Sequence, residues 1–84
     1  MELKKLGNNE TQVNQNGYLV LYSYHTPVAI HHLASGQEWR TSKKWSATTS
    51  KHINKWVSDK AIAVTQETLE AIIKDGYTSA LQRN

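Results

Sequence analysis

The chain contains no cysteine, and this absence excludes several kinds of chemistry. Disulfide bonds, a thiolate nucleophile and a zinc site built on sulfur all require cysteine side chains. No apolar run approaches the roughly 18 residues that a membrane span needs, and no charged segment followed by an apolar one opens the chain as a secretory leader would. We therefore expect no membrane partner, and a reducing compartment such as a cytoplasm is compatible with the composition.

The chain is 84 residues long, and 38% of its residues are hydrophobic. A chain of this length buries enough apolar surface for one thin core, so we expect a single small domain over residues 1–84. Residues 1–9 are polar apart from two isolated leucines beyond the first residue, and they are expected to form a flexible arm. Residues 77–84 are expected to form a fraying tail.

Residues 10–41 predict a β-meander. The pair Asn16-Gly17 favours a two-residue hairpin turn, because both turn positions need positive φ. Pro27 cannot donate to a ladder, so it fits a turn or the first position of a strand. Apolar residues on both faces of the strongest strand indicate that it is central. The expected strands cover residues 18–24, 28–33 and 37–41, with a fourth at 11–15.

Residues 42–76 predict the helical part of the domain, because apolar residues recur there at intervals of three and four. The first helix would bury a stripe that includes Trp45 and Trp56. A second helix would have Thr65 as its N-cap and would stop at Gly76. The expected fold class is α+β, with a three- to four-stranded antiparallel meander packed on one face by two C-terminal helices. The expected core consists of Leu19, Leu21, Ile30, Trp39, Trp45, Ile53, Trp56, Leu69, Ile72 and Ile73.

Positive charge is concentrated in the middle of the chain. Ten Lys and Arg stand against seven Asp and Glu overall, but between positions 40 and 60 six bases stand against one acid. A basic segment in an otherwise mildly acidic chain is typical of a protein that binds a polyanion. The simpler interpretation is a solvated helix face on which lysines maintain solubility.

The position of the first helix decides how these charges would be arranged. If it begins early, four side chains form one ridge beside its apolar stripe: Lys44, Thr48, Lys51 and Lys55. Ammonium groups on such a ridge can neutralise successive phosphates, and short hydroxyls can fix the position of a backbone. If the helix begins at Ser46 or later, its free amides and these hydroxyls form an anion pocket at its N-terminus. The candidate nucleic-acid-binding residues are Arg40, Lys43, Lys44, Thr48, Thr49, Ser50, Lys51, His52 and Lys55.

Other chemistry has less support in the sequence. Aromatic side chains of the strands could stack on unpaired bases, although such residues in small domains are usually core. They are Tyr18, Tyr22, Tyr24 and Trp39. Adjacent His31 and His32 would point to opposite faces of a strand, so they cannot bind one metal ion together. Because no nucleophile, base and orienting acid converge in the pattern, we expect no enzyme, no metal site and no cofactor.

Two segments carry a resemblance to known sequences: SYHTPVA at 23–29 and RTSKKWSATTSKHINKW at 40–56. Over about residues 18–57 the chain resembles a family of small uncharacterised proteins found largely in bacteriophages and environmental viral sequences. The resemblance implies a viral setting and no particular mechanism. It also implies that four residues are typical of the family: Thr49, Ser50, His52 and Asn54.

Three functional hypotheses follow. The first is a small phage-type nucleic-acid-binding protein that contacts the phosphate backbone with the basic surface of residues 40–60. The second is a phage accessory protein that docks on a host protein, such as a nuclease, a polymerase or a defence component, and inhibits it. The third is a structural or assembly component of a virion, for which a homodimer is compatible with the sequence. We expect the protein in the cytoplasm of the host cell.

Overall fold

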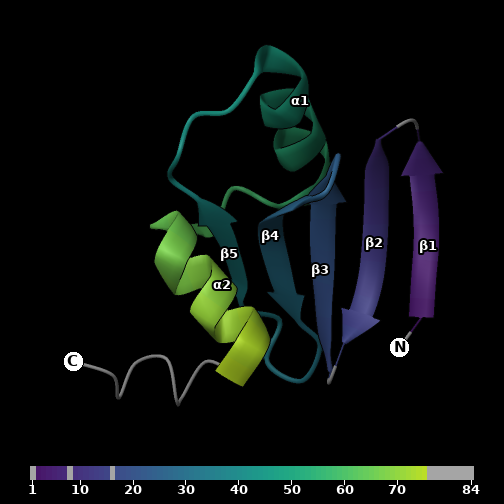
Figure 1. Cartoon of the computed structure of the whole chain (residues 1–84). Coiled ribbons are helices and arrows are strands. Elements are labelled where there is room, and N and C mark those ends of the chain that lie inside the picture. The colour runs from purple at the N-terminus through teal and green to yellow at the C-terminus, as the bar shows by residue number, and fades with distance from the viewer. Residues whose placement is uncertain (1, 8, 16, 76–84) are drawn as a thin grey trace.

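The computed structural model describes residues 2–7, 9–15 and 17–75. In this part of the chain six strands form one sheet, and the strands lie in the sheet in their chain order. Two helices accompany the sheet (Figure 1). The elements are β1 (Glu2–Gly7), β2 (Glu10–Gln15), β3 (Tyr18–Ser23), β4 (Thr26–His32), β5 (Glu38–Thr41), α1 (Ala47–Trp56), β6 (Ile62–Val64) and α2 (Gln66–Asp75).

The first five strands form an antiparallel meander, which is longer than the three to four strands expected. The pairing of Gln15 with Tyr18 and the φ of +83° at Gly17 confirm the hairpin turn between β2 and β3. Pro27 lies opposite Tyr22, directly beside a bulge in the β3–β4 ladder, where its missing donor is tolerated. β6 differs from the others because it pairs with β5 in parallel, after α1 has carried the chain back along the sheet.

The α+β class is confirmed, but the expectation of three to four antiparallel strands is wrong. β1 occupies most of the expected flexible arm, and it pairs with β2 from Glu2 to Gly7. Its lysines and exposed leucines suit an edge strand. Such a strand lacks the alternation of apolar and polar residues that marks a half-buried strand in a sequence. β6 is only three residues long, and its sequence resembles a short apolar connection. The expected tail at 77–84 and the stop at Gly76 lie outside the described residues.

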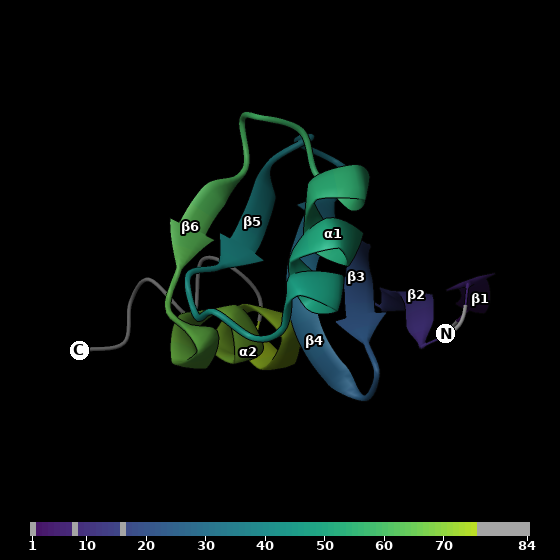
Figure 2. The same cartoon turned by 90° about the horizontal axis from the view of Figure 1, so that it is seen from above.

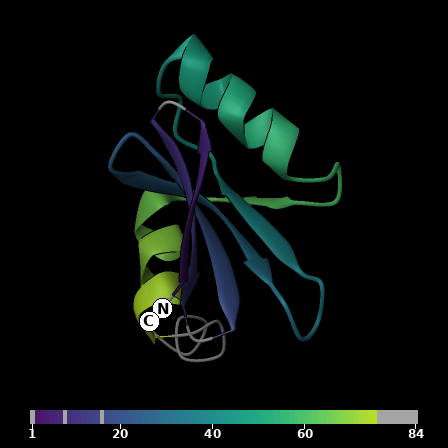
Figure 3. The same ribbon diagram turned by 90° about the vertical axis from the view of Figure 1, so that its right-hand side faces the viewer.

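The two helices pack on opposite faces of the sheet, so the expectation of one covered face is also wrong. On one face Leu21 and Ala29 pack against Ile53 of α1. On the other face Ile30 and Trp39 pack with residues of α2. Figure 2 and Figure 3 show α1 and α2 on different sides of the strands. Because neighbouring residues of a strand point to opposite faces, strands that are apolar on both sides need cover on both.

The helix boundaries explain which expected core residues are buried. α1 begins at Ala47, and its N-cap is Ser46, whose hydroxyl accepts a hydrogen bond from the Thr49 amide. Trp45 therefore lies outside the helix and is 40% exposed, so its placement in the core is wrong. The Thr65 hydroxyl accepts from the Thr68 amide at the start of α2, which confirms that cap. The expected core residues that are buried are Leu21, Ile30, Trp39, Ile53, Leu69 and Ile72, while Leu19, Trp56 and Ile73 are half-buried.

Neither helix of the described chain is long and apolar enough to cross a membrane. α1 and α2 each contain ten residues, and both have one apolar stripe that faces the sheet. The helices therefore stabilise the fold by covering the two faces of the sheet.

Packing of α2 on the sheet can be tested at Leu69, which is fully buried against Ile30 and Trp39. We expect Leu69→Ala to lower the free energy of unfolding by about 2–5 kcal/mol, because it removes buried methyl groups and leaves a cavity. Leu33→Ala is the matched control, because Leu33 is exposed, and it is expected to cost less than about 0.5 kcal/mol. Urea unfolding measures both, and equal effects would contradict this packing.

Candidate nucleic-acid interface

Basic side chains lie on α1, on the loop 42–46 that joins β5 to α1, and at Arg40 of β5. We name this the α1 basic surface, and its residues are Arg40, Lys43, Lys44, Lys51 and Lys55. Arg40, Lys43 and Lys44 line one shallow depression together with Trp45 and Ser50. Lys51 and Lys55 line a second one along the helix with Thr48 and Asn54. A hydrogen bond of 3.1 Å joins Arg40 Nη1, which lines the first depression, to Asn54 Oδ1, which lines the second.

One acid of the described chain, Glu10, forms an ion pair with this surface. Glu10 lies buried beneath α1, and its Oε1 accepts a hydrogen bond of 3.3 Å from Lys55 Nζ. The Lys55 side chain is nevertheless 70% exposed. Among the described residues, no carboxylate lies within ion-pair distance of Lys43, Lys44 or Lys51. These three ammonium groups are therefore available to an external anion.

The arrangement at the start of α1 follows the second of the two helix positions considered from the sequence. Lys44 lies in the loop, so it does not continue the helical ridge of Thr48, Lys51 and Lys55. The Lys43 ammonium lies 4.2 Å from the centre of the Trp45 ring. This cation–π contact holds an exposed aromatic ring beside the basic depression.

Two of the candidate residues do not face solvent. Thr49 and His52 are buried on the side of α1 that faces the sheet. Thr49 Oγ1 lies 3.0 Å from Ser23 Oγ, and His52 Nδ1 lies 2.9 Å from the same hydroxyl. Both side chains are almost fully buried, although His52 lines the depression along the helix and Thr49 lines the one beside the loop 42–46. Ser50 is half-buried, whereas Thr48 is exposed.

Thr49, His52, Ser23 and Glu10 form a buried polar cluster between α1 and the sheet. His52 Nε2 lies 3.7 Å from Glu10 Oε1, which is close enough for electrostatic attraction when the ring is protonated. Trp56 adds a contact at the end of the helix, because its Nε1 donates to Gln12 Oε1 at 3.0 Å. Neither Ser23 nor Glu10 is marked by a sequence pattern as a partner of the helix. The polar pair Thr49 and His52 beside an apolar helical stripe was the available signal that partners lie opposite.

Serine, histidine and glutamate are the residue types of a hydrolytic triad, but their geometry here serves another purpose. Ser23 is 2% exposed, and its hydroxyl is shared between Thr49 and His52 inside the structure. A nucleophile must reach a substrate, which this hydroxyl does not. The cluster instead fixes the rotation of α1 on the sheet. No group of three or more potential metal ligands occurs among the described residues.

Glu38 of β5 forms hydrogen bonds with Ser58, which lies two residues after the end of α1. Its carboxylate accepts hydrogen bonds from the amide and the hydroxyl of Ser58, and His31 Nδ1 lies 3.1 Å from its other oxygen. Burial alone would raise the pKa of Glu38, but the hydrogen bonds from Ser58 and the interaction with His31 outweigh it and lower the pKa below the usual value of 4.5. The ionised carboxylate therefore stabilises the folded state.

The buried cluster is tested by Ser23→Ala. This change leaves the Thr49 hydroxyl and His52 Nδ1 without their partner in a buried place, so we expect a loss of about 1–3 kcal/mol in the free energy of unfolding. Ser42→Ala, at an exposed position, serves as the control. Chemical denaturation at neutral pH measures both, and a neutral Ser23→Ala would show that the cluster does not anchor α1.

The Glu38 contacts predict a pH dependence. Because the pKa of Glu38 is lowered on folding, its contribution to stability is present above the unfolded value of 4.5 and is lost as the pH falls through the folded-state pKa. Glu38→Gln should therefore be less stable than the parent at pH 7, and the difference should shrink as the pH falls below 4.5. Urea unfolding between pH 7 and pH 3 measures it, with Glu67→Gln as the control for net charge. A difference that stays constant over this range would contradict the assignment.

The aromatic residues proposed as stacking surfaces divide into two groups. Trp39 is buried, and Tyr18 stacks on His32 with ring centres 4.6 Å apart beside the core of the α2 face. Tyr22 and Tyr24 line a hollow at the β1–β3 end of the sheet. Of these four residues Tyr24 is exposed, whereas Tyr18 and Tyr22 are both half-buried.

The comparisons with known proteins concern nearly the whole described chain. A family of unknown function, DUF8033, matches residues 1–73. No curated protein and no solved structure matches the chain. The matched segment includes the sheet, the α1 basic surface and most of α2. The chain therefore belongs to the DUF8033 family of unknown function.

Proposed function

We propose that this protein binds nucleic acid, and that the α1 basic surface contacts the phosphate backbone. The observation that carries the proposal is the exposure of Lys43, Lys44 and Lys51 with no carboxylate of the described chain at ion-pair distance. When exposed ammonium groups neutralise phosphates, the counterions condensed on the nucleic acid are released, and this release drives association.

The distribution of charge between the two helices supports the proposal. α2 carries Glu67 and Glu70 as exposed acids, and it packs on the face of the sheet opposite α1. The exposed acids of α2 are therefore separated from the α1 basic surface, and although Lys74 of α2 is also exposed, the α1 side attracts a polyanion more strongly. A surface that used lysines for solubility alone would not need this separation.

The chemistry of the surface suits the backbone of a nucleic acid more than the edges of its bases. Lysine ammonium groups act as point charges toward phosphates, and the Thr48 and Ser50 hydroxyls are short donors that fix position along a backbone. Arg40 is held by Asn54 and retains further guanidinium donors for a phosphate. We propose binding with little dependence on sequence.

The resemblance of residues 18–57 to viral proteins supports a phage protein that acts in the cytoplasm of a host cell. Docking on a host protein and assembly into a virion are the competing roles. A pull-down from host lysate separates them, because nuclease treatment should release every partner of a nucleic-acid-binding protein. A stoichiometric protein retained after nuclease treatment would favour docking instead.

Charge reversal tests the surface directly. We expect Lys44→Glu and Lys51→Glu each to weaken binding, and the double variant to reduce the logarithmic salt slope by about 1.4 on single strands or about 1.8 on duplex DNA. Lys74→Glu makes the same change of charge on α2, on the opposite face, and should have a much smaller effect. Fluorescence anisotropy with labelled oligonucleotides, repeated from about 50 to 200 mM salt, measures affinity and slope.

Two results would contradict the proposal. One is the absence of binding by the parent protein in the micromolar range at about 50 mM salt, because non-specific binders usually reach this range even at higher salt. The other is an equal loss of affinity in Lys51→Glu and Lys74→Glu, which would indicate a response to net charge and not to the α1 basic surface.

A further inference from the structure

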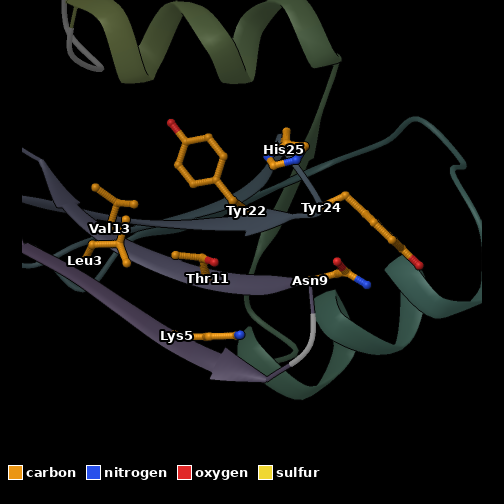
Figure 4. Close-up of a pocket in the computed structure, with 8 residues that line it drawn as sticks. All are labelled: Leu3, Lys5, Asn9, Thr11, Val13, Tyr22, Tyr24 and His25. Atoms are coloured by element: carbon orange, nitrogen blue, oxygen red, sulfur yellow. The ribbon is translucent and has the colours of Figure 1, made fainter.

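A second surface lies on the part of the sheet that α2 leaves uncovered. α2 packs against β4 and β5, and on the same face of the sheet Val13 and Val20 are buried, whereas Leu3 and Lys5 of the edge strand β1 are exposed. A hollow of about 510 Å³ occupies this place (Figure 4). Ligand pockets in proteins commonly have volumes of about 300–1,000 Å³. The lining residues are Leu3, Lys5, Asn9, Thr11, Val13, Tyr22, Tyr24 and His25.

The chemistry of the hollow is aromatic and basic. Tyr22 contributes a ring, Tyr24 lines the rim and directs its ring toward α1, Lys5 contributes an ammonium group, and His25 adds an imidazole. Leu3 and Val13 contribute apolar surface, and none of the lining residues is an acid. Rings give planar surfaces for bases, while a cation nearby can neutralise the phosphate that follows each base.

The backbone at the rim of the hollow is held in an unusual conformation. Asn9 has a φ of 61° and Tyr24 a φ of 59°, and both lie in the left-handed region. Asparagine tolerates this region, but a tyrosine there is unusual and costs energy. The Tyr24 amide donates to the Asn9 carbonyl at 2.6 Å, which ties the two turns together. The strained turn leaves the Tyr24 side chain exposed at the corner of the sheet, and the residue is 49% exposed.

The hollow lies close to the α1 basic surface. Asn9 directly precedes Glu10, whose carboxylate contacts Lys55. Figure 4 shows the Tyr24 side chain extending from its turn toward α1, whereas Tyr22 projects toward the side of the sheet that carries α2. A polymer bound along Lys51 and Lys55 would therefore reach Tyr24 first and could continue to Tyr22 around the end of the sheet.

We propose that this hollow binds the unpaired bases of single-stranded nucleic acid, which stack on Tyr24 and Tyr22 while Lys5 contacts a phosphate. This inference rests on the proposed function and specifies its ligand as single strands in preference to duplex. Bases inside a duplex are already stacked on each other and are not free to stack on these rings. Stacking tolerates every base, so it adds affinity without adding sequence specificity.

The test compares a labelled twelve-nucleotide oligo(dT) or oligo(U) with a twelve-base-pair duplex at fixed salt. Tyr24→Asn is the principal variant, because asparagine removes the ring and accepts the left-handed backbone of this turn. Tyr22→Leu is the second variant, since it keeps apolar bulk at a half-buried position. Leu33→Ala, at an exposed site away from the hollow, is the control. Thermal unfolding establishes that each variant is folded.

We expect the parent protein to prefer the single strands. Tyr24→Asn and Tyr22→Leu should each weaken single-strand binding by about fivefold or more, as the loss of one stacked base predicts. Duplex binding should change by less than twofold in both variants. Lys5→Glu should weaken single-strand binding and leave duplex binding nearly unchanged.

The outcomes separate this inference from the proposed function. If Lys51→Glu weakens binding while Tyr24→Asn and Tyr22→Leu leave single-strand affinity unchanged, base stacking is overturned and backbone binding stands. If the tyrosine variants weaken duplex and single strands equally, the preference for unpaired bases is overturned. If the parent protein binds neither oligonucleotide, both proposals fail. A host protein retained after nuclease treatment and lost in Tyr24→Asn would assign the hollow to a protein partner instead.

Discussion

The buried polar cluster beneath α1 determines which side of that helix faces outward. Thr49 and His52 converge on the Ser23 hydroxyl, and Ile53 packs beside them on Leu21 and Ala29. Polar groups that are buried must be paired, so a rotation of the helix would leave several of them without partners. Because this rotation is fixed, Thr48, Lys51 and Lys55 face solvent. The α1 basic surface is therefore a consequence of the contacts on the hidden side of the helix.

The cluster also explains why Lys55 has a carboxylate partner, whereas the other lysines of the α1 basic surface have none among the described residues. Glu10 is needed beneath α1, and its carboxylate attracts the Lys55 ammonium at the edge of the helix. Lys51 lies one turn earlier and has no carboxylate of the described chain at ion-pair distance. An exposed ion pair contributes little to stability, so Lys55 can exchange Glu10 for an external phosphate at small cost.

Local patterns in the sequence predicted the central elements well. The Asn-Gly pair located a hairpin, and the period of three to four residues located both helices. The edges of the sheet could not be predicted in the same way. β1 is polar and β6 is short, so each depends on a neighbour already in place, and neither has a pattern of its own. The face covered by each helix was likewise set by tertiary packing, which leaves no local signal.

The candidate site shows the same division between local and tertiary information. The concentration of lysines between positions 40 and 60 is visible in the sequence, and the structure places several of them on one surface. The roles of Thr49 and His52 were not visible, because an interior partner such as Ser23 lies 26 and 29 residues away along the chain. Trp45 was assigned to the core because its spacing matched the helical stripe, but the Ser46 cap starts the helix just after it.

The parallel pairing of β6 with β5 imposes an order on folding. Each hairpin of the meander joins neighbours in sequence, so its ends meet after a short loop closes. β6 can pair with β5 only after the chain has passed through α1, which makes that contact non-local. We expect the antiparallel strands to assemble first and the crossover to complete the sheet afterwards. α1 is thus joined at one end to β5 and at the other to β6, and the pairing of β6 with β5 completes the crossover that contains the helix.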